Sequence, residues 1–179
     1  LASRLGLADA GVTALVVSDT AAAIQAAAST LVTAVNSFVV SDNGFITGSV
    51  ALVSKVYTDG SSYGNYAIVD TAANVVTASG TPGLVQFAQS VTVTGNATKA
   101  QADTLAGLTA MGPITYSISD TAANIAGGSA AGRNEATNIT VTGAAATLAQ
   151  AVTINGATNS GTDSYAISDT AAALAGASA

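Results

Sequence analysis

The stretch Ile118-Ser119-Asp120-Thr121-Ala122-Ala123-Asn124-Ile125 decides the fold, because closely similar stretches recur along the chain. Three further copies begin at Val17, Ile68 and Ile167 and read VSDTAAAI, IVDTAANV and ISDTAAAL. The four copies begin 51, 50 and 49 residues apart. Self-similarity at a fixed spacing indicates a repeat protein, in which one supersecondary motif is stacked many times.

Weaker copies of the same motif lie between the strong ones. They begin at Val40, Val93 and Val141 and read VSDNG, VTGNA and VTGAA. The central aliphatic residues of all copies therefore fall at positions 17, 40, 68, 93, 118, 141 and 167. These intervals of 23 to 28 residues give a true period of about 25, in two alternating versions.

Each copy contains a predicted strand with two different faces. The central position and the position two before it are apolar in every copy, so they share the face that packs in the core. The earlier of the two positions holds Leu15, Phe38, Tyr66, Val91, Tyr116, Ile139 and Tyr165. The opposite face is mostly Ser, Thr, Ala and Val and carries no charge. The β-branched enrichment favours a strand.

An alanine-rich stretch after each strand predicts a short helix. An Asp or Thr at the turn can serve as its N-cap, and Ile24, Val75, Ile125 and Leu174 fall where helical spacing points inward. The clearest helices are expected over residues 20–36 and 98–108.

The predicted fold is an α/β repeat, a β/α solenoid of about seven coils that covers residues 1–179 as one domain. A helix between successive strands makes those strands parallel. The layout is that of leucine-rich repeats, with a parallel sheet on one side and short helices on the other. The coil between 40 and 68 is expected to be irregular, because the Gly-rich turn after residues 49–59 favours extra strand or a hairpin over a helix.

The composition argues against several functions. The four cations, Arg4, Lys55, Lys99 and Arg133, are scattered, so a nucleic-acid partner is not expected. Polar residues interrupt every apolar run, so no transmembrane segment is expected. The chain has no His and no Cys, and Glu135 is its only glutamate, which leaves little for catalysis and excludes imidazole or thiolate metal sites. We therefore expect a protein that is not an enzyme and needs no cofactor.

The aspartates at the ends of the strands are the most chemically suggestive feature. They are Asp19, Asp42, Asp70, Asp120 and Asp169. One interpretation is helix capping and turn formation. The alternative is a ladder of carboxylates that binds calcium between coils. Gly95 and Gly143 interrupt the series, and a calcium loop normally gathers several carboxylates in one turn, so capping is the favoured interpretation.

The small hydroxylated face of the sheet is a possible binding surface. It includes Thr92, Thr94, Ser117, Ser119, Thr140 and Thr142. Regular Thr-x-Thr pairs could bind ice, and a flat hydroxylated face could bind a glycan or another protein. Ordinary β-propensity explains the same threonines without a ligand.

The Ser-Asp-Thr-Ala-Ala-Asn-Ile motif resembles the (S/T)DTAAN(I/L) repeats of very long secreted bacterial surface proteins, which are adhesin-like. This resemblance implies an extracellular or cell-surface location and a structural or adhesive role. Relatives of this kind often carry glycine- and aspartate-rich calcium nonapeptides, but this chain contains none.

The leading functional expectation is a structural protein, part of a filament, sheath, surface layer or adhesin stalk. Residues 1–10 are interpreted as the helix of a preceding coil and residues 169–179 as an unfinished coil. Polar capping repeats are absent from this pattern, so self-association or further repeats of the same chain are expected. The alternative is a binding module that uses the hydroxylated face.

Overall fold

The protein is a mixed α/β structure in which parallel strands alternate with short helices. The computed structural model describes residues 14–42, 44–57 and 65–176. The chain divides into two compact units. Unit 1 comprises Leu1–Asp70, Ala78–Thr92 and Thr109–Pro113, and unit 2 comprises Thr71–Thr77, Val93–Leu108 and Ile114–Ala179.

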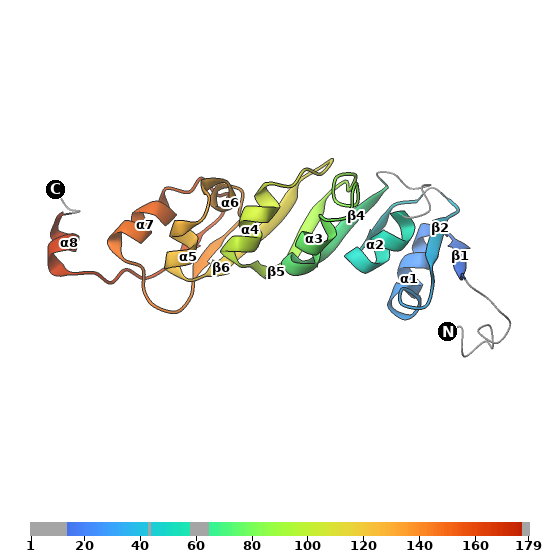
Figure 1. Cartoon of the computed structure of the whole chain (residues 1–179), viewed down its shortest axis with the longest axis horizontal. Coiled ribbons are helices and arrows are strands. Elements are labelled where there is room, and N and C mark those ends of the chain that lie inside the picture. The colour runs from blue at the N-terminus through green and yellow to red at the C-terminus, as the bar shows by residue number, and fades with distance from the viewer. Residues whose placement is uncertain (1–13, 43, 58–64, 177–179) are drawn as a thin grey trace. The chain divides into compact units, whose positions relative to one another are not determined.

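Unit 1 is built from two parallel strand pairs and the helices beside them (Figure 1). Strands β1 and β2 pair with Val17 opposite Phe38, and β3 and β4 pair with Ile46 opposite Tyr66. Helices α1 and α2 contact β2 and β3. In chain order the elements are β1 (Val16–Asp19), α1 (Ala21–Leu31), β2 (Ser37–Val40), β3 (Ile46–Gly48), α2 (Val50–Tyr57) and β4 (Tyr66–Thr71).

Unit 2 continues the alternation of strand and helix (Figure 1). Strand β7 pairs in parallel with β6 and with β8. Helix α4 contacts β6 and α6, and α5 contacts α7. The elements are α3 (Ala72–Ala78), β5 (Val91–Ala97), which begins in unit 1, α4 (Lys99–Ala106), β6 (Ile114–Asp120), α5 (Ala122–Gly127), α6 (Ala130–Asn134), β7 (Ile139–Val141), α7 (Leu148–Asn155), β8 (Asp163–Ser164) and α8 (Ala171–Gly176).

The helices begin where the sequence places a hydroxyl residue. In each strong motif the hydroxyl of the threonine after the aspartate accepts the backbone N–H three residues later, as Thr121 accepts that of Asn124, and Thr20 and Thr121 have extended backbone angles. Thr98 and Thr147 form full capping boxes with Gln101 and Gln150. Alanine-rich sequence then sustains the helix, since alanine has the highest helix propensity. Helices are present where they were expected over 20–36 and 98–108, as α1 and α4, but α1 ends at Leu31, five residues before the expected end.

The predicted core positions are confirmed in part. Leu174, predicted to point inward, is 42% exposed, and of the central aliphatics Ile68, Val93 and Ile118 are buried whereas Ile167 is 47% exposed. Five of the seven residues two positions before the central aliphatic are buried, and the inward helix residues Ile24, Val75 and Ile125 are at most 1% exposed. Tyr66 and Tyr116 are buried in these positions and donate their hydroxyls to the carbonyls of Leu84 and Gly132. The five buried residues are Phe38, Tyr66, Val91, Tyr116 and Ile139.

The paired strands are offset by two residues from the alignment of the motif copies. Spacing alone places Ile118 opposite Val141, whereas Ile118 lies opposite Ile139. The same shift places Val17 opposite Phe38 rather than Val40. A shift of two residues keeps every side chain on its face of the sheet, so the hydrophobic pattern cannot distinguish the two registers.

The segment between residues 40 and 68 corrects the sequence-based expectation. Val50–Tyr57 is the helix α2, not a strand or hairpin. The strand β3 lies before the expected segment, ahead of the helix, and pairs in parallel with β4. The segment therefore contains a full strand and helix of its own. A buried run such as Leu52, Val53 and Val56 fits a helix as well as a strand, so periodicity did not separate them.

The last predicted strand is only partly formed. Strand β8 covers Asp163–Ser164, and Ile167 forms a single parallel bridge with Ala146. The helical interpretation of residues 1–10 and the Gly-rich turn at 60–64 lie outside the described residues.

Candidate functional site

The aspartate at the end of a strand binds the helix of the preceding strand–helix repeat. In each of four cases a carboxylate oxygen accepts the backbone N–H of the first residue of a helix 20 or 21 positions earlier. These four contacts span 2.9–3.0 Å and join Asp42 to Ala21, Asp70 to Val50, Asp120 to Lys99 and Asp169 to Leu148. Each contact lies within one unit and joins two successive repeats. We call these contacts the repeat junctions.

The same carboxylates also fix the turn that starts their own repeat. One oxygen of Asp120 accepts the Thr121 N–H at 2.8 Å, while the other accepts the Lys99 N–H at 2.9 Å. Asp169 makes the same pair of contacts with Thr170 and Leu148. A negative group at a helix N-terminus satisfies an orphan N–H and complements the positive end of the helix dipole. One side chain thus orients two helices.

At the junctions of Asp42, Asp120 and Asp169, hydrogen bonds stabilise the charged form of the carboxylate and lower its pKa. The Ala21 N–H is the main cause that lowers the pKa of Asp42, and the Leu148 N–H does the same for Asp169. Burial opposes the shift at Asp120, but the N–H of Lys99 and the amide of Asn124 outweigh it, so the pKa of Asp120 is also lowered.

Glycine replaces the aspartate in two of the repeats for a conformational reason. Gly95 and Gly143 have φ of 71° and 77°. L-residues rarely adopt this left-handed region, whereas glycine enters it without a steric penalty. One version of the repeat therefore ends its strand with an aspartate, and the other ends it with a glycine in the left-handed region.

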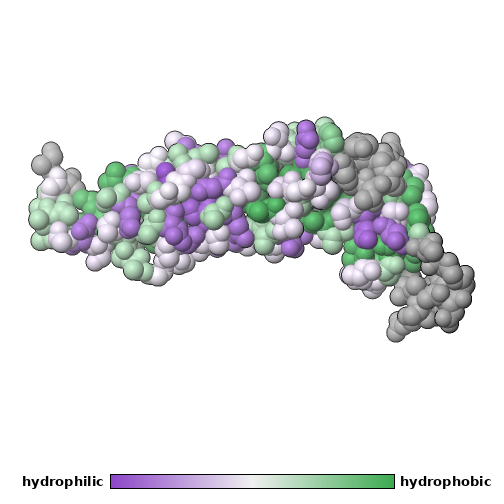
Figure 2. Space-filling model, in the orientation of Figure 1, coloured by the Kyte–Doolittle hydropathy of each residue, from purple (hydrophilic) through white to green (hydrophobic). Residues whose placement is uncertain are grey.

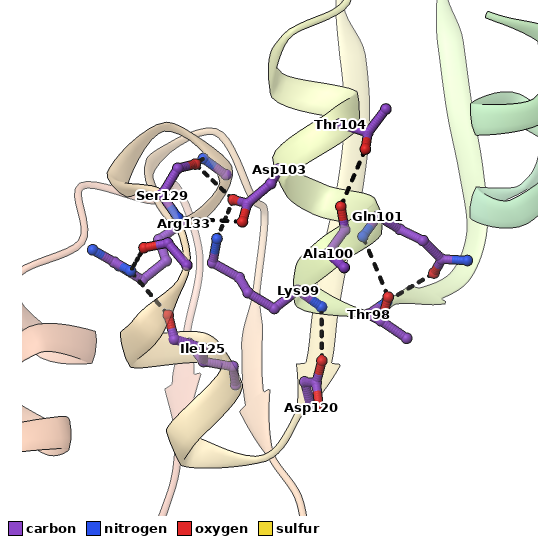
Figure 3. Close-up of polar contacts among 12 residues, drawn as sticks. Thr98, Lys99, Ala100, Gln101, Asp103, Thr104, Asp120, Ile125, Ser129 and Arg133 are labelled. Atoms are coloured by element: carbon purple, nitrogen blue, oxygen red, sulfur yellow. Dashed lines mark hydrogen bonds and ion pairs between the residues drawn. The ribbon is translucent and has the colours of Figure 1, made fainter. Parts of the chain in front are cut away.

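A polar cluster joins α4 to the turn between α5 and α6 (Figure 3). Lys99 is only 2% exposed and forms an ion pair with Asp103, one helical turn later. Asp103 in turn accepts the Ser129 hydroxyl at 2.6 Å and the Ser129 N–H at 3.2 Å. The hydrogen bonds from Ser129 and Lys99 lower the pKa of Asp103 against the opposing effect of burial.

Arg133 completes this cluster from the other side. Its guanidinium donates to the carbonyls of Ile125 at 2.9 Å and Gly128 at 2.8 Å, so it caps the C-terminus of α5 (Figure 3). A cation at this position complements the negative end of the helix. Gly128 lies directly against Lys99, and a side chain there would collide with the amine.

An open groove of about 380 Å³ lies beside this cluster. Its polar lining comes from Lys99, Asp103, Asp120 and Asn124, and the rest is alanine and glycine. The polar groups are already engaged with one another: Lys99 with Asp103, and Asn124 with Asp120 at 2.7 Å. No aromatic side chain lines the groove, so the groove lacks a stacking surface for a sugar or base.

The five strand-end aspartates accept hydrogen bonds from backbone amides of helices and turns. Among the described residues, no three acidic, His or Cys side chains gather where they could hold a metal ion. Asp42, Asp70, Asp120 and Asp169 each direct an oxygen to a helix amide, and Asp19 accepts the Thr20 N–H at 2.8 Å. The geometry is that of helix capping between repeats.

The hydroxylated face is exposed only in part. In unit 2, Thr94 and Thr142 are exposed, whereas Ser117, Ser119 and Thr140 are half-buried. Thr140 lies opposite Ser119 and Ser164, so hydroxyl side chains do align across β6, β7 and β8. Thr92 belongs to unit 1 and is exposed there.

The cluster of Lys99, Asp103, Ser129 and Arg133 was not found from the sequence. The spacing of Lys99 and Asp103 is a signal of an ion pair on a helix. A second signal is a comparison of two repeats: Thr98-Lys99-Ala100-Gln101-Ala102-Asp103 corresponds to Thr147-Leu148-Ala149-Gln150-Ala151-Val152. The ion pair replaces two apolar residues, which marks α4 as locally different.

The chain was compared with protein-family models, with curated proteins and with solved structures, and no match was found. Of the helices in the described ranges, none is both long and apolar enough to cross a membrane.

Proposed function

We propose that this chain is a stretch of β/α solenoid that serves as a structural, non-enzymatic part of an extracellular filament, sheath, surface layer or adhesin stalk. In this proposal about seven repeats of some 25 residues stack through their strands and helices. The repeats form an extended structural element and catalyse no reaction.

The repeat junction is the observation that carries the proposal. Four aspartates each connect two successive repeats, and the paired strands are offset by 20 to 24 residues, close to one repeat. A repeat that depends on its neighbour for a helix cap gains stability from stacking rather than from its own core. This coupling between neighbouring repeats supports a structural role, in which many repeats stack into an extended element.

The chemistry of the side chains also supports a structural role. The described cluster of Lys99, Asp103, Ser129 and Arg133 is saturated with internal hydrogen bonds, and its charges hold helix ends. Ser129, the hydroxyl in this cluster, is the N-cap of α6 and accepts the Gly132 N–H. The hydroxyl group of Ser129 therefore has a structural role.

Immunogold labelling of the producing cells tests the proposal. An antibody raised against this chain is expected to decorate extended material outside the cell or at its surface. The matched control is the same antibody after absorption with the purified chain. Label confined to the cytoplasm would overturn the proposal.

A binding role for the hydroxylated face is the second candidate, favoured by the exposure of Thr94 and Thr142 and by the alignment of Ser119, Thr140 and Ser164 across three strands. A Thr94→Lys/Thr142→Lys variant separates the two. If the chain is a binding module, adsorption to ice or to a glycan array is lost in this variant. If the chain is structural, the surface labelling persists unchanged.

A further inference from the structure

We infer that Asn96 is an N-glycosylation site, at which a transferase attaches a sugar to the amide nitrogen of the side chain. The inference rests on the proposed extracellular or cell-surface role, because triplets of the Asn-x-Ser/Thr type are glycosylation acceptors in secreted proteins. It assigns to the chain a modification that the structural role does not require.

The sequence contains two triplets of this type, Asn96-Ala97-Thr98 and Asn138-Ile139-Thr140. The asparagine receives the sugar, the residue two positions later carries a hydroxyl, and the middle residue is not proline. Such triplets also arise by chance, so the pattern alone does not select between the two. The structure places the two asparagines in different surroundings, and this difference selects Asn96.

Asn96 lies at an open strand end. It is exposed near the end of β5 and follows Gly95, which has φ of 71°. A Cβ added at Gly95 would meet no atom within 4 Å, so there is room beside this part of the strand. The strand leads directly into α4, and Figure 2 shows hydrophilic surface over the α4–α6 region. A glycan, which is bulky and hydrophilic, would remain in solvent here.

The side-chain amide of Asn96 is not used by the fold. Within the described ranges it forms no hydrogen bond and no other polar contact. Ala97, the middle residue of the triplet, is 0% exposed and anchors this segment in the core. A sugar on Asn96 therefore displaces no interaction of the folded chain.

Thr98 supplies the hydroxyl of the triplet and is itself exposed. Its oxygen accepts the Gln101 N–H at 3.3 Å as the N-cap of α4 (Figure 3). That hydrogen bond uses a lone pair of the oxygen and leaves the O–H group as a donor. Both recognition positions of the triplet, the amide and the hydroxyl, are therefore accessible to a transferase.

Asn138 is also exposed, but its amide is held at both ends. The oxygen accepts the Thr162 N–H at 3.0 Å, and the nitrogen donates to the Ser117 hydroxyl at 3.5 Å. A Cβ added at Gly161 would collide with the amide oxygen, so the chain is packed closely against it. Thr140 is half-buried within β7, which is paired on both edges. A sugar on this nitrogen would break the bond to Ser117.

The transfer forms one bond and breaks one. The Asn96 Nδ2 attacks the anomeric carbon of a sugar that is activated as a glycosyl phosphate, carried by a lipid or by a nucleotide. The bond from the anomeric carbon to the phosphate oxygen breaks, and the phosphate leaves with the electron pair. One amide proton passes to a base of the transferase, so the product is an N-linked sugar and a released phosphate.

Mass spectrometry of peptides from the chain purified from its producing cells tests the inference. The peptide that contains Asn96 is expected to carry a sugar on that residue, and the peptide that contains Asn138 is expected to carry none. The mass of the added group distinguishes the donors, because a nucleotide donor adds one sugar at a time and a carrier lipid delivers a preassembled oligosaccharide. An unmodified Asn96 overturns the inference.

Four variants made in the same cells locate the acceptor. Asn96→Gln and Thr98→Ala should lose the sugar completely, whereas Thr98→Ser should keep it, because serine retains both the hydroxyl and the N-cap. Asn138→Gln is the matched control and should carry the same sugar as the wild type. A sugar that persists in Asn96→Gln, or that is lost in Asn138→Gln alone, overturns the inference.

Immunogold labelling of the wild-type cells separates this failure from failure of the proposed function. Label at the cell surface together with an unmodified Asn96 contradicts the glycosylation alone. Label confined to the cytoplasm contradicts the proposed function, whatever the state of Asn96.

Discussion

At the scale of single residues, the molecule depends on aspartates that hold two backbone segments at once. Asp120 and Asp169 each bind the threonine amide of their own turn and the first amide of the preceding helix. A helix N-terminus otherwise leaves four N–H groups without partners. The aspartate therefore acts as a capping residue supplied from the next repeat.

Replacing Asp120 by alanine should destabilise α4, whose first amide donates to Asp120, more than α5, the helix that follows Asp120 in the chain. The loss of a capping side chain costs about 0.5–2 kcal/mol. Urea denaturation should show this decrease in the free energy of unfolding, and hydrogen exchange should show faster exchange of the Lys99 amide. Thr121→Ala is the control, since Thr121 caps α5 and its loss should expose the Asn124 amide instead. Unchanged protection at Lys99 in Asp120→Ala would contradict the junction.

The two glycines at strand ends make a second prediction at this scale. Gly143→Ala should destabilise the fold by about 1 kcal/mol, because φ of 77° is strained for any residue with a Cβ. A Cβ at Gly143 would meet no atom within 4 Å, so the cost would come from the backbone alone. Gly127→Ala is the matched control: it also lacks a neighbour within 4 Å but lies in α5 with an ordinary φ. Thermal melts should show opposite shifts, since alanine favours a helix.

At the scale of secondary-structure elements, α4 differs from its counterpart α7. Both begin with a capping box, at Thr98 and Thr147. Helix α4 carries the buried Lys99 and its partner Asp103, which bind the α5–α6 turn through Ser129. Helix α7 has Leu148 and Val152 at the same positions. The ion pair is therefore a local adaptation to the turn that α6 adds.

The ion pair between Lys99 and Asp103 should contribute less to the free energy of unfolding than is lost when only one of its two partners is removed. Asp103→Val leaves the amine of Lys99 buried without its partner, which is expected to cost about 3 kcal/mol. The double variant Lys99→Leu/Asp103→Val imitates α7 and should recover most of that loss. Urea denaturation of the two single variants and the double variant measures the coupling. A double variant that is less stable than Asp103→Val would show that the pair itself contributes the stability.

At the scale of the whole molecule, stability should depend on pH through the carboxylates. The folded-state pKa values of Asp42, Asp103, Asp120 and Asp169 lie below the ordinary value of 3.8. A group whose pKa is lower in the folded chain stabilises the fold above the unfolded pKa, and this contribution is lost as pH falls through the folded pKa. Burial raises the pKa of Asp163, which acts in the opposite sense.

The urea midpoint should therefore fall as pH decreases below about 4. The triple variant Asp42→Asn/Asp120→Asn/Asp169→Asn should be less stable at neutral pH and show a flatter dependence on pH. Parallel curves for the wild type and the triple variant would show that other carboxylates control acid stability.

A chelator should leave the melting temperature unchanged. In the described part of the chain, the strand-end carboxylates are engaged with helix amides and form no group of three that could hold a metal. Calorimetry with calcium or with EDTA checks this expectation, and a melting temperature that rises with calcium would restore the calcium ladder. Magnesium is the control for ionic strength and charge.

The sequence by itself determined the local features of this protein. The alternation of strand and helix, the parallel pairing, the threonine caps and the buried positions of Phe38, Tyr66 and Ile125 all follow from side-chain size, periodicity and turn chemistry. These properties depend on residues that are close in the sequence, and the pattern that indicates them recurs in each copy of the repeat. The same reasoning failed at Val50–Tyr57, where an apolar run was compatible with either structure.

Only the tertiary structure decided which segments meet. The register, the helix that each aspartate caps, and the cluster of Lys99 with Asp103 and Ser129 all join residues about 20 or more positions apart or depend on such contacts. A register shift of two preserves every face, so the pattern of apolar residues is equally satisfied by both alignments. The hydrogen bonds and packing between neighbouring repeats distinguish them, because these interactions depend on distances that no local pattern encodes.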